Sequence, residues 1–268
     1  MIGKEFILRI DKYYANSRFD ELEAFLLDSL HSTASSDPTF RITFRIIVLN
    51  ELGTYYRGAT RFEEAIHFFH ASIAELEKTT GTNSLEYATA INNLGGAYRM
   101  SGQFDAARRC FEKMIPIYIQ YKDKSPMLYA SGINNLALLD MAEHNYDRAI
   151  PALQNALAIM SVSSRYRWEQ ATTICNLGIC MLRMGHLEDA ESYLIQAHDM
   201  ICAMPESSQG HLAAIQSALG DLYLKQKEDE KALAAFEAAK GLILKHYGKN
   251  SDYRNACQTI KLLKPNPL

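Results

Sequence analysis

Small and apolar residues recur along the chain at a nearly constant interval. A leucine followed by a small residue returns at steps of 42, 42, 41 and 42 residues, with the small residue at Gly53, Gly95, Ala137, Gly178 and Gly220. Twelve positions later comes an alanine, at Ala65, Ala107, Ala149, Ala190 and Ala232. A large apolar residue follows four positions further on, at Phe69, Phe111, Leu153, Leu194 and Phe236. Five units that keep one register indicate a repeat architecture.

Each unit contains two stretches with helical spacing. In three units an aromatic residue follows the small one by three positions, at Tyr56, Tyr98 and Tyr223, which places both on one side of a helix. A break is predicted around Gly58, Gly102, Asn145 and Gly185, and a second helix is predicted to begin near Phe62, Phe104, Tyr146 and Leu187. A small residue where two helices cross lets their backbones approach closely. Since one helix pair cannot bury its apolar faces alone, we expect the pairs to stack into a solenoid.

The predicted fold is all-α, with about six helix pairs and a C-terminal capping helix in a single domain over residues 1–268. Residues 1–36 are predicted to be a divergent N-terminal repeat, because Phe19, Leu22 and Leu26 follow the pattern of later second helices at a shift of 43 residues. Residues 249–268 are predicted to form the cap, with Ser251 as the helix N-cap. The five regular repeats are predicted at 37–80, 81–122, 123–163, 164–205 and 206–248.

The Leu-Gly, aromatic, alanine and phenylalanine positions resemble the tetratricopeptide repeat over roughly residues 40–250. That family usually has a period of about 34 residues. The longer period here, together with the segments INNLG and INNLA, resembles the kinesin light chain type, which also occurs in bacterial regulators that sense peptides. The resemblance implies a right-handed superhelix whose first helices line a concave groove and whose second helices form the convex surface.

Asparagines occupy corresponding positions in consecutive first helices. Asn50, Asn92 and Asn134 stand three residues before the small residue, and Asn93, Asn135 and Asn176 stand two before it. Asparagine is a poor residue for a helix interior, but its amide offers an acceptor and two donors that match a peptide group. We therefore predict that these side chains hold an extended peptide by its backbone. The resemblance implies the same role for Asn93, Asn135 and Asn176. The alternative is that the asparagines tie neighbouring helices together or cap loops.

Three arginines are predicted near the same surface. Arg57 and Arg99 stand at equivalent positions, and Arg183 lies one residue further round its helix. A guanidinium group suits carboxylates, so these residues are candidates for reading acidic side chains or a peptide C-terminus. The alternative is that they are ordinary exposed arginines. Acidic residues on or near this surface are Glu51, Asp140 and Asp221.

Composition restricts the possible partners. The 28 Lys and Arg residues nearly balance 31 Asp and Glu residues, for a formal net charge of −3, which argues against a nucleic-acid binder. No apolar run reaches the length of a membrane-spanning helix, and the first residues do not resemble a secretory signal. The five cysteines are odd in number and lack the spacing of a zinc site. We therefore expect a cytoplasmic protein without a nucleic-acid or membrane partner.

Motifs for catalysis are missing from the sequence. There is no H-E-x-x-H, Walker or G-x-S-x-G motif and no dinucleotide fingerprint. Glu63, His67 and His70 have a spacing that could touch a metal, but a polar helix edge is the better interpretation. The sequence therefore predicts no enzyme activity, no cofactor and no metal.

The preferred hypothesis is a non-catalytic protein–protein interaction module that binds an extended peptide or partner segment in its groove. The alternative is a peptide-sensing regulatory domain whose superhelix changes pitch when ligand binds. The sequence does not identify the partner or the oligomeric state.

Overall fold

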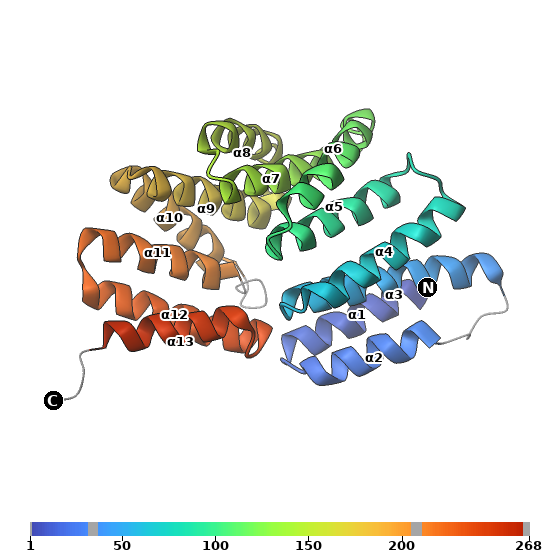
Figure 1. Ribbon diagram of the computed structural model, residues 1–268, viewed down its shortest axis with the longest axis horizontal. Helices are drawn as coiled ribbons and strands as arrows, with labels where there is room; N and C mark the ends of the chain where they lie inside the picture. Colours follow the sequence, from blue (N-terminus) through green and yellow to red (C-terminus); the bar gives the residue numbers. More distant parts are fainter. Residues whose placement is uncertain (1, 32–36, 205–210, 265–268) are drawn as a thin grey trace. The chain divides into compact units, whose positions relative to one another are not determined.

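The computed structural model describes residues 2–31, 37–204 and 211–264, which fold into consecutive helices joined by short turns (Figure 1). No strand occurs within these ranges. The elements are α1 Ile2–Ala15, α2 Phe19–His31, α3 Pro38–Gly58, α4 Phe62–Thr79, α5 Leu85–Met100, α6 Phe104–Gln120, α7 Pro126–Ala142, α8 Tyr146–Met160, the 3-10 turn η1 Ser164–Tyr166, α9 Arg167–Met184, α10 Leu187–Cys202, α11 Leu212–Gln226, α12 Asp229–Tyr247 and α13 Ser251–Leu263. The predicted all-α fold of helix pairs followed by a terminal helix is confirmed.

The chain divides into two compact units, Met1–Leu139 and Asp140–Leu268. In the first unit, one apolar core runs through α1 to α6 and includes Leu22, Phe69 and Phe111. In the second unit, the largest core cluster includes Leu194 and Leu222. A single solenoid over residues 1–268 stays a prediction. The parts of the predicted repeats at 32–36 and 205–210, and the end of the predicted cap at 265–268, lie outside the described residues.

The small residue of the repeat marks the closest approach of two helices. A methyl carbon added to Gly53 would lie 2.5 Å from the ring of Phe69, and one added to Gly95 would lie 2.6 Å from the ring of Phe111. The same relationship joins Gly178 to Leu194 at 2.9 Å and Gly220 to Phe236 at 2.7 Å. These distances are too short for a side chain, because real carbon contacts lie near 3.5–4.0 Å. The same contact, between helix backbone without a side chain and a large side chain from the next helix, therefore recurs along the chain.

The turns between paired helices require a left-handed residue. Gly102 and Gly185 supply it at the predicted breaks, with φ of 79° and 88°. In other turns the left-handed residue is not glycine: it is Thr60 with φ of 59°, His144 with φ of 62° and Lys227 with φ of 63°. The breaks are thus where the sequence predicts them, although Gly58 ends α3 and Thr60, two positions later, makes the turn.

The two ends of the chain have their own packing. Phe6 and Ile10 of α1 and Leu26 of α2 are buried, at most 5% exposed. At the other end, Ala256 and Ile260 of α13 are buried in clusters with residues of α12. The predicted N-cap at Ser251 is wrong by one position. Asn250 has the extended backbone of a cap and its side chain accepts a hydrogen bond from the backbone N–H of Tyr253 at 3.0 Å, so Ser251 is the first helical residue.

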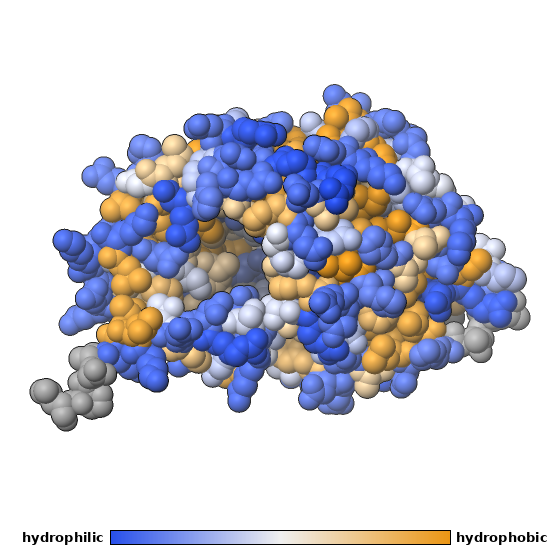
Figure 2. Space-filling view, viewed as in Figure 1, coloured by the Kyte–Doolittle hydropathy of each residue, from blue (hydrophilic) through white to orange (hydrophobic). Residues whose placement is uncertain are grey.

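Large apolar side chains that face water are scattered among charged ones, and Figure 2 shows the two kinds interspersed over the visible face. The most exposed are Leu8 on α1, Val162 after α8 and Leu262 on α13, at 52%, 79% and 79%. Within the described ranges, no helix has both the length and the apolar character needed to cross a membrane.

Candidate functional site

Two of the predicted arginines and one asparagine gather on a surface made by α3 and α5. Gly96 follows Asn93 by three residues and precedes Arg99 by three, so all three positions lie on neighbouring parts of α5. The side chain of Arg57 reaches this place from α3, because a methyl carbon added to Gly96 would lie 3.1 Å from Nη1 of Arg57. We call Arg57, Asn93 and Arg99 the α3–α5 cluster.

The positive charges of the two guanidinium groups in this cluster are poorly compensated by their surroundings. Burial lowers the pKa of Arg57, and a weaker interaction with Tyr14 opposes that effect. Burial and the positive charge of Arg57 lower the pKa of Arg99 to about 10. The Nε atom of Arg99 is buried and has no hydrogen-bond partner within the described part of the chain. No carboxylate there lies within 4.0 Å of either guanidinium. The two charges repel each other, and neither has an ion-pair partner among the described residues.

Asn93 is one of the six predicted asparagines, and the described residues do not use the hydrogen-bonding groups of its side-chain amide. Its side chain is half-buried on α5, and no described residue makes a hydrogen bond with it. It lies one turn before Gly96, over which Arg57 extends. The cluster therefore brings together two positive charges and one neutral group that can both donate and accept.

Three other asparagines connect helices inside the first unit. Asn135 of α7 donates to Oδ1 of Asn92 on α5 at 3.0 Å, and Asn92 is only 6% exposed. Asn50 of α3 donates to the hydroxyl of Ser72 on α4 at 2.9 Å and to its own helix at the carbonyl of Ile46. The helix-tying role that the sequence left as an alternative is thus realised in these contacts.

The remaining predicted asparagines lie in different surroundings. Asn134 is partly buried on α7, in the first unit. Asn176 is on α9, in the second unit, and is 7% exposed. The structure brings Asn92 and Asn135 into contact, and it leaves peptide binding by any of the six a prediction.

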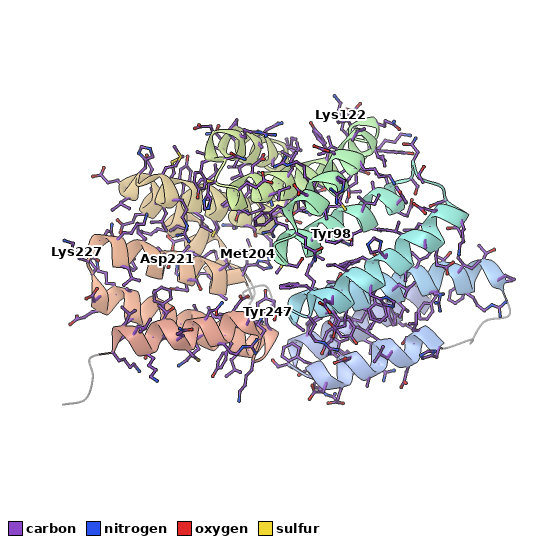
Figure 3. The ribbon with its side chains drawn as sticks, viewed as in Figure 1. Tyr98, Lys122, Met204, Asp221, Lys227 and Tyr247 are labelled. Carbon is purple, nitrogen blue, oxygen red and sulfur yellow. The ribbon has the colours of Figure 1, made fainter. Side chains whose placement is uncertain are left out.

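Arg183 differs from the other two arginines because it has an internal partner. Its Nη2 lies 3.2 Å from Oδ2 of Asp221, which α11 presents as labelled in Figure 3. Burial raises the pKa of Asp221, while Arg183 and Lys225 oppose that effect. The other acids of the sequence prediction lie apart from this pair: Asp140 is 3% exposed with Arg148 at 4.0 Å, and burial followed by the charge of Asp11 raises the pKa of Glu51.

A cleft of about 320 Å³, which the sequence pattern did not indicate, opens between α4, α5 and α6. At one end His70 hydrogen-bonds the hydroxyl of Tyr98 at 2.8 Å, and Tyr98 is labelled near the end of α5 in Figure 3. At the other end Tyr87 donates to Glu77 at 3.0 Å and accepts a hydrogen bond from Lys113. His70 thus has a tyrosine partner. Across the residues described, no group of three His, Cys, Asp or Glu side chains has the geometry to hold a metal ion.

Several solved structures are similar to this chain in fold. NprR in complex with its cognate peptide NprX is similar with a TM-score of 0.72 and 12% identity, covering 96% of this chain and 72% of that one. A Rap protein complexed with competence and sporulation factor has a TM-score of 0.60 and 12% identity, over 97% and 71%. The TPR-like repeats of a Podosopora anserina protein assigned as a kinesin light chain have a TM-score of 0.53 and 18% identity, over 75% and 96%.

Sequence comparison gives the family. Comparison with curated proteins finds no match. Family profiles described as tetratricopeptide repeat match residues 44–120, 128–203 and 213–246, which together make up more than half of the chain. These matches cover the units in which the recurring Gly–Phe contact was found. The chain therefore belongs to the tetratricopeptide repeat family.

Proposed function

We propose that this protein is a non-catalytic interaction module that binds an extended peptide or partner segment along its first helices. The observation that carries the proposal is the α3–α5 cluster, in which Asn93 and two guanidinium groups have hydrogen-bonding capacity that the described residues do not use. Buried polar groups are normally satisfied, so unused capacity on one surface favours an external ligand. A peptide backbone offers both the N–H and the C=O that an asparagine amide needs.

Two similarities support a peptide as the ligand. The structures of NprR and of the Rap protein, both similar in fold to this chain, were solved with a peptide and with competence and sporulation factor, respectively. Tetratricopeptide repeats also stack so that each repeat contacts its neighbours, which creates the extended surfaces used by such binders. The wider set proposed to contact the peptide is Asn50, Asn92, Asn134, Asn135, Asn176 and Arg183, together with the α3–α5 cluster.

The substitution Asn93→Ala tests the proposed peptide binding. Because Asn93 makes no hydrogen bond with any described residue, its loss should not lower stability by breaking an internal contact. The probe is a degenerate heptapeptide library applied to the whole protein, with retained peptides quantified by mass spectrometry. We expect wild type to retain peptides and Asn93→Ala to lose at least tenfold in affinity for them. Asn155→Ala, which changes an exposed asparagine of α8, is the matched control. Equal retention by wild type and Asn93→Ala would contradict the proposal.

The alternative function is a peptide-sensing regulatory domain. The repeat architecture favours it, because small rotations between neighbouring repeats set the curvature of a solenoid. X-ray scattering of the protein with and without a retained peptide distinguishes the two functions. A changed scattering profile supports the sensor, and an unchanged profile supports a static module.

A further inference from the structure

We propose that the cleft between α4, α5 and α6 binds a small molecule that consists of one aromatic ring and one negatively charged group. Ile91, Leu94 and Tyr98 lie on the face of α5 that lines this cleft. Asn93 and Arg99 lie on the opposite face, because an α-helix turns by about 100° per residue. The site is therefore separate from the α3–α5 cluster, and the inference does not depend on the peptide-binding function proposed above.

The preceding repeat fills the corresponding place with an aromatic side chain of its own. Tyr98 and Cys110 stand 42 residues after Tyr56 and Phe68, so the two pairs occupy equivalent positions. The rings of Tyr56 and Phe68 are stacked, with centroids 5.4 Å apart and planes 6° from parallel. Tyr98 and Cys110 both line the cleft, but a cysteine has no ring to stack on the tyrosine. The chain thus has a cleft of about 320 Å³ at the position where the preceding repeat has a phenylalanine ring.

The ring of Tyr98 is held in place, but no described residue stacks on it. His70 hydrogen-bonds its hydroxyl at 2.8 Å and meets the ring nearly edge-on, with an interplanar angle of 71°. The equivalent Tyr223 has the ammonium group of Lys231 over its ring, 5.4 Å from the centroid. The residue equivalent to Lys231 in the repeat of Tyr98 is Ala106, which has no charge to place there. Within the described ranges, the Tyr98 ring therefore has neither a parallel aromatic partner nor a cation over it.

The size and walls of the cleft suit a single substituted ring. Its volume is about twice the roughly 150 Å³ of a cavity that holds benzene, and it is at the lower end of the range of small-molecule sites. Ile73, Ile91 and Leu94 give it an apolar lining and are each at most 8% exposed. Burial raises the pKa of the Cys110 thiol to about 11, so at neutral pH the thiol is uncharged and adds to the apolar wall.

Positive charge lies beside the proposed ring site. Arg109 and Lys113 of α6 both line the cleft, and the charges of both act on Cys110 against the effect of burial. Lys113 donates a hydrogen bond to Tyr87, which in turn donates to Glu77, the one carboxylate of the lining. Arg109 makes no hydrogen bond or ion pair with a described residue. The excess positive charge favours a ring that carries one negative charge, by an amount that exposure to solvent keeps small.

Three related probes test the ring and the charge separately. Sodium phenylacetate is titrated into the ¹⁵N-labelled whole protein at constant ionic strength, and we expect saturable NMR shifts of the backbone signals of Tyr98 and Cys110. Cyclohexylacetate keeps the charge without the aromatic ring, and phenylacetamide keeps the ring without the charge; each should bind about threefold more weakly. Equal binding of all three probes, or no saturable shift with phenylacetate, would overturn the inference. Tighter binding of N-acetylphenylalanine amide than of phenylacetate would also overturn it, because the occupant would then be an aromatic side chain of a partner protein.

Substitution of Cys110 provides a matched pair of variants. Cys110→Phe gives this repeat the ring that Phe68 gives the preceding one, so we expect phenylacetate binding to be lost and the thermal midpoint to rise. Cys110→Ala leaves the cleft open and should retain binding. Tyr98→Leu removes the stacking partner and should abolish the preference for phenylacetate over cyclohexylacetate, a result that does not depend on whether Cys110→Phe folds. Arg109→Gln should weaken phenylacetate and leave phenylacetamide unchanged. Wild-type binding by a Cys110→Phe protein with an intact circular dichroism spectrum, or an unchanged ring preference in Tyr98→Leu, would contradict the proposal.

Discussion

Nδ2 of Asn135 donates a hydrogen bond to Oδ1 of Asn92 over 3.0 Å and joins the first helices of two consecutive repeats, α5 and α7. The two residues do not occupy equivalent positions, since Asn92 is three residues before Gly95 and Asn135 is two residues before Ala137. The contact therefore links the two rows of asparagines that the sequence shows side by side. An asparagine from each row serves the stacking of repeats, and such a bond leaves each amide with capacity for a further partner.

A double-mutant cycle on this pair should detect their coupling. Asn135→Ala leaves the buried carbonyl oxygen of Asn92 without its donor, so we expect it to lower the free energy of unfolding by about 1–2 kcal/mol. The double variant with Asn92→Ala should cost less than the sum of the single variants, with a coupling energy of about 1 kcal/mol. Urea unfolding followed by circular dichroism measures all four proteins. Additive effects would mean that the hydrogen bond contributes nothing to stability.

Gly95→Ala should be destabilising, because the added methyl group would lie 2.6 Å from the ring of Phe111. We expect a loss of about 1–3 kcal/mol, the usual range for overpacking a core. Gly241→Ala is the matched control, since no described atom beyond the neighbouring backbone of α12 lies within 4 Å of the added carbon. That control should raise stability by about 0.5–1 kcal/mol through helix propensity. Similar effects of both substitutions on the thermal midpoint would refute the close-approach explanation.

His211 should make the stability of the protein depend on pH. Burial and then the charge of His246 lower the pKa of His211 from 6.5 to about 4, and its ring is nearly perpendicular to that of Trp168 at a centroid distance of 4.2 Å. Between pH 6.5 and pH 4 the unfolded chain binds a proton at His211 and the folded protein does not. The free energy of unfolding therefore falls as the pH falls through this window.

The contribution of His211 is isolated by substitution. Across that pH window, wild type should lose about 2–3 kcal/mol more stability than His211→Gln. Chemical unfolding at half-unit pH steps measures the difference, and His31→Gln, at the exposed end of α2, is the control. Parallel pH profiles for wild type and His211→Gln would rule out the predicted proton linkage.

Arg99→Met should stabilise the protein in the absence of ligand. Burial and the charge of Arg57 lower the pKa of Arg99 to about 10, so folding disfavours its charged form. Replacing it with an apolar side chain of similar length should raise the free energy of unfolding by about 1–2 kcal/mol. Arg109→Met, at an exposed position, should change stability by less than about 0.5 kcal/mol. A loss of stability in Arg99→Met would show that the arginine has an internal role.

The repeat pattern could predict the helix pairs because the same steric requirement recurs in each unit. Gly53, Gly95 and Gly220 all meet a phenylalanine ring from the following helix, and a requirement met by fixed residue types leaves a visible period. The N-cap of α13 could not be predicted to the residue, since Asn250 and Ser251 are adjacent and both are good caps. The left-handed residue Thr60 could not be predicted either, because a β-branched residue rarely adopts that conformation.

The sequence predicts the candidate site less completely than it predicts the fold. The positions of the asparagines and arginines could be listed from the period, but their partners depend on distances between helices. Nothing in the sequence distinguishes Asn93, which has no partner among the described residues, from Asn135, which stands at the equivalent position and donates to Asn92. Likewise, the sequence shows Arg183 only one residue further round its helix than Arg57, and it does not show that Gly96 lies beside Arg57 and Asp221 beside Arg183.

The contact between the small residue and the large apolar one joins positions that are close together in the sequence, as with Gly95 and Phe111. Contacts of this kind require only a short loop to close, and proteins rich in them fold quickly. Each helical hairpin can thus form this contact before the neighbouring hairpins have folded, and folding can start at more than one hairpin. A gene segment that encodes one hairpin would consequently carry this contact with it when it is duplicated, and stacking on the neighbouring hairpins would supply the rest of the stability.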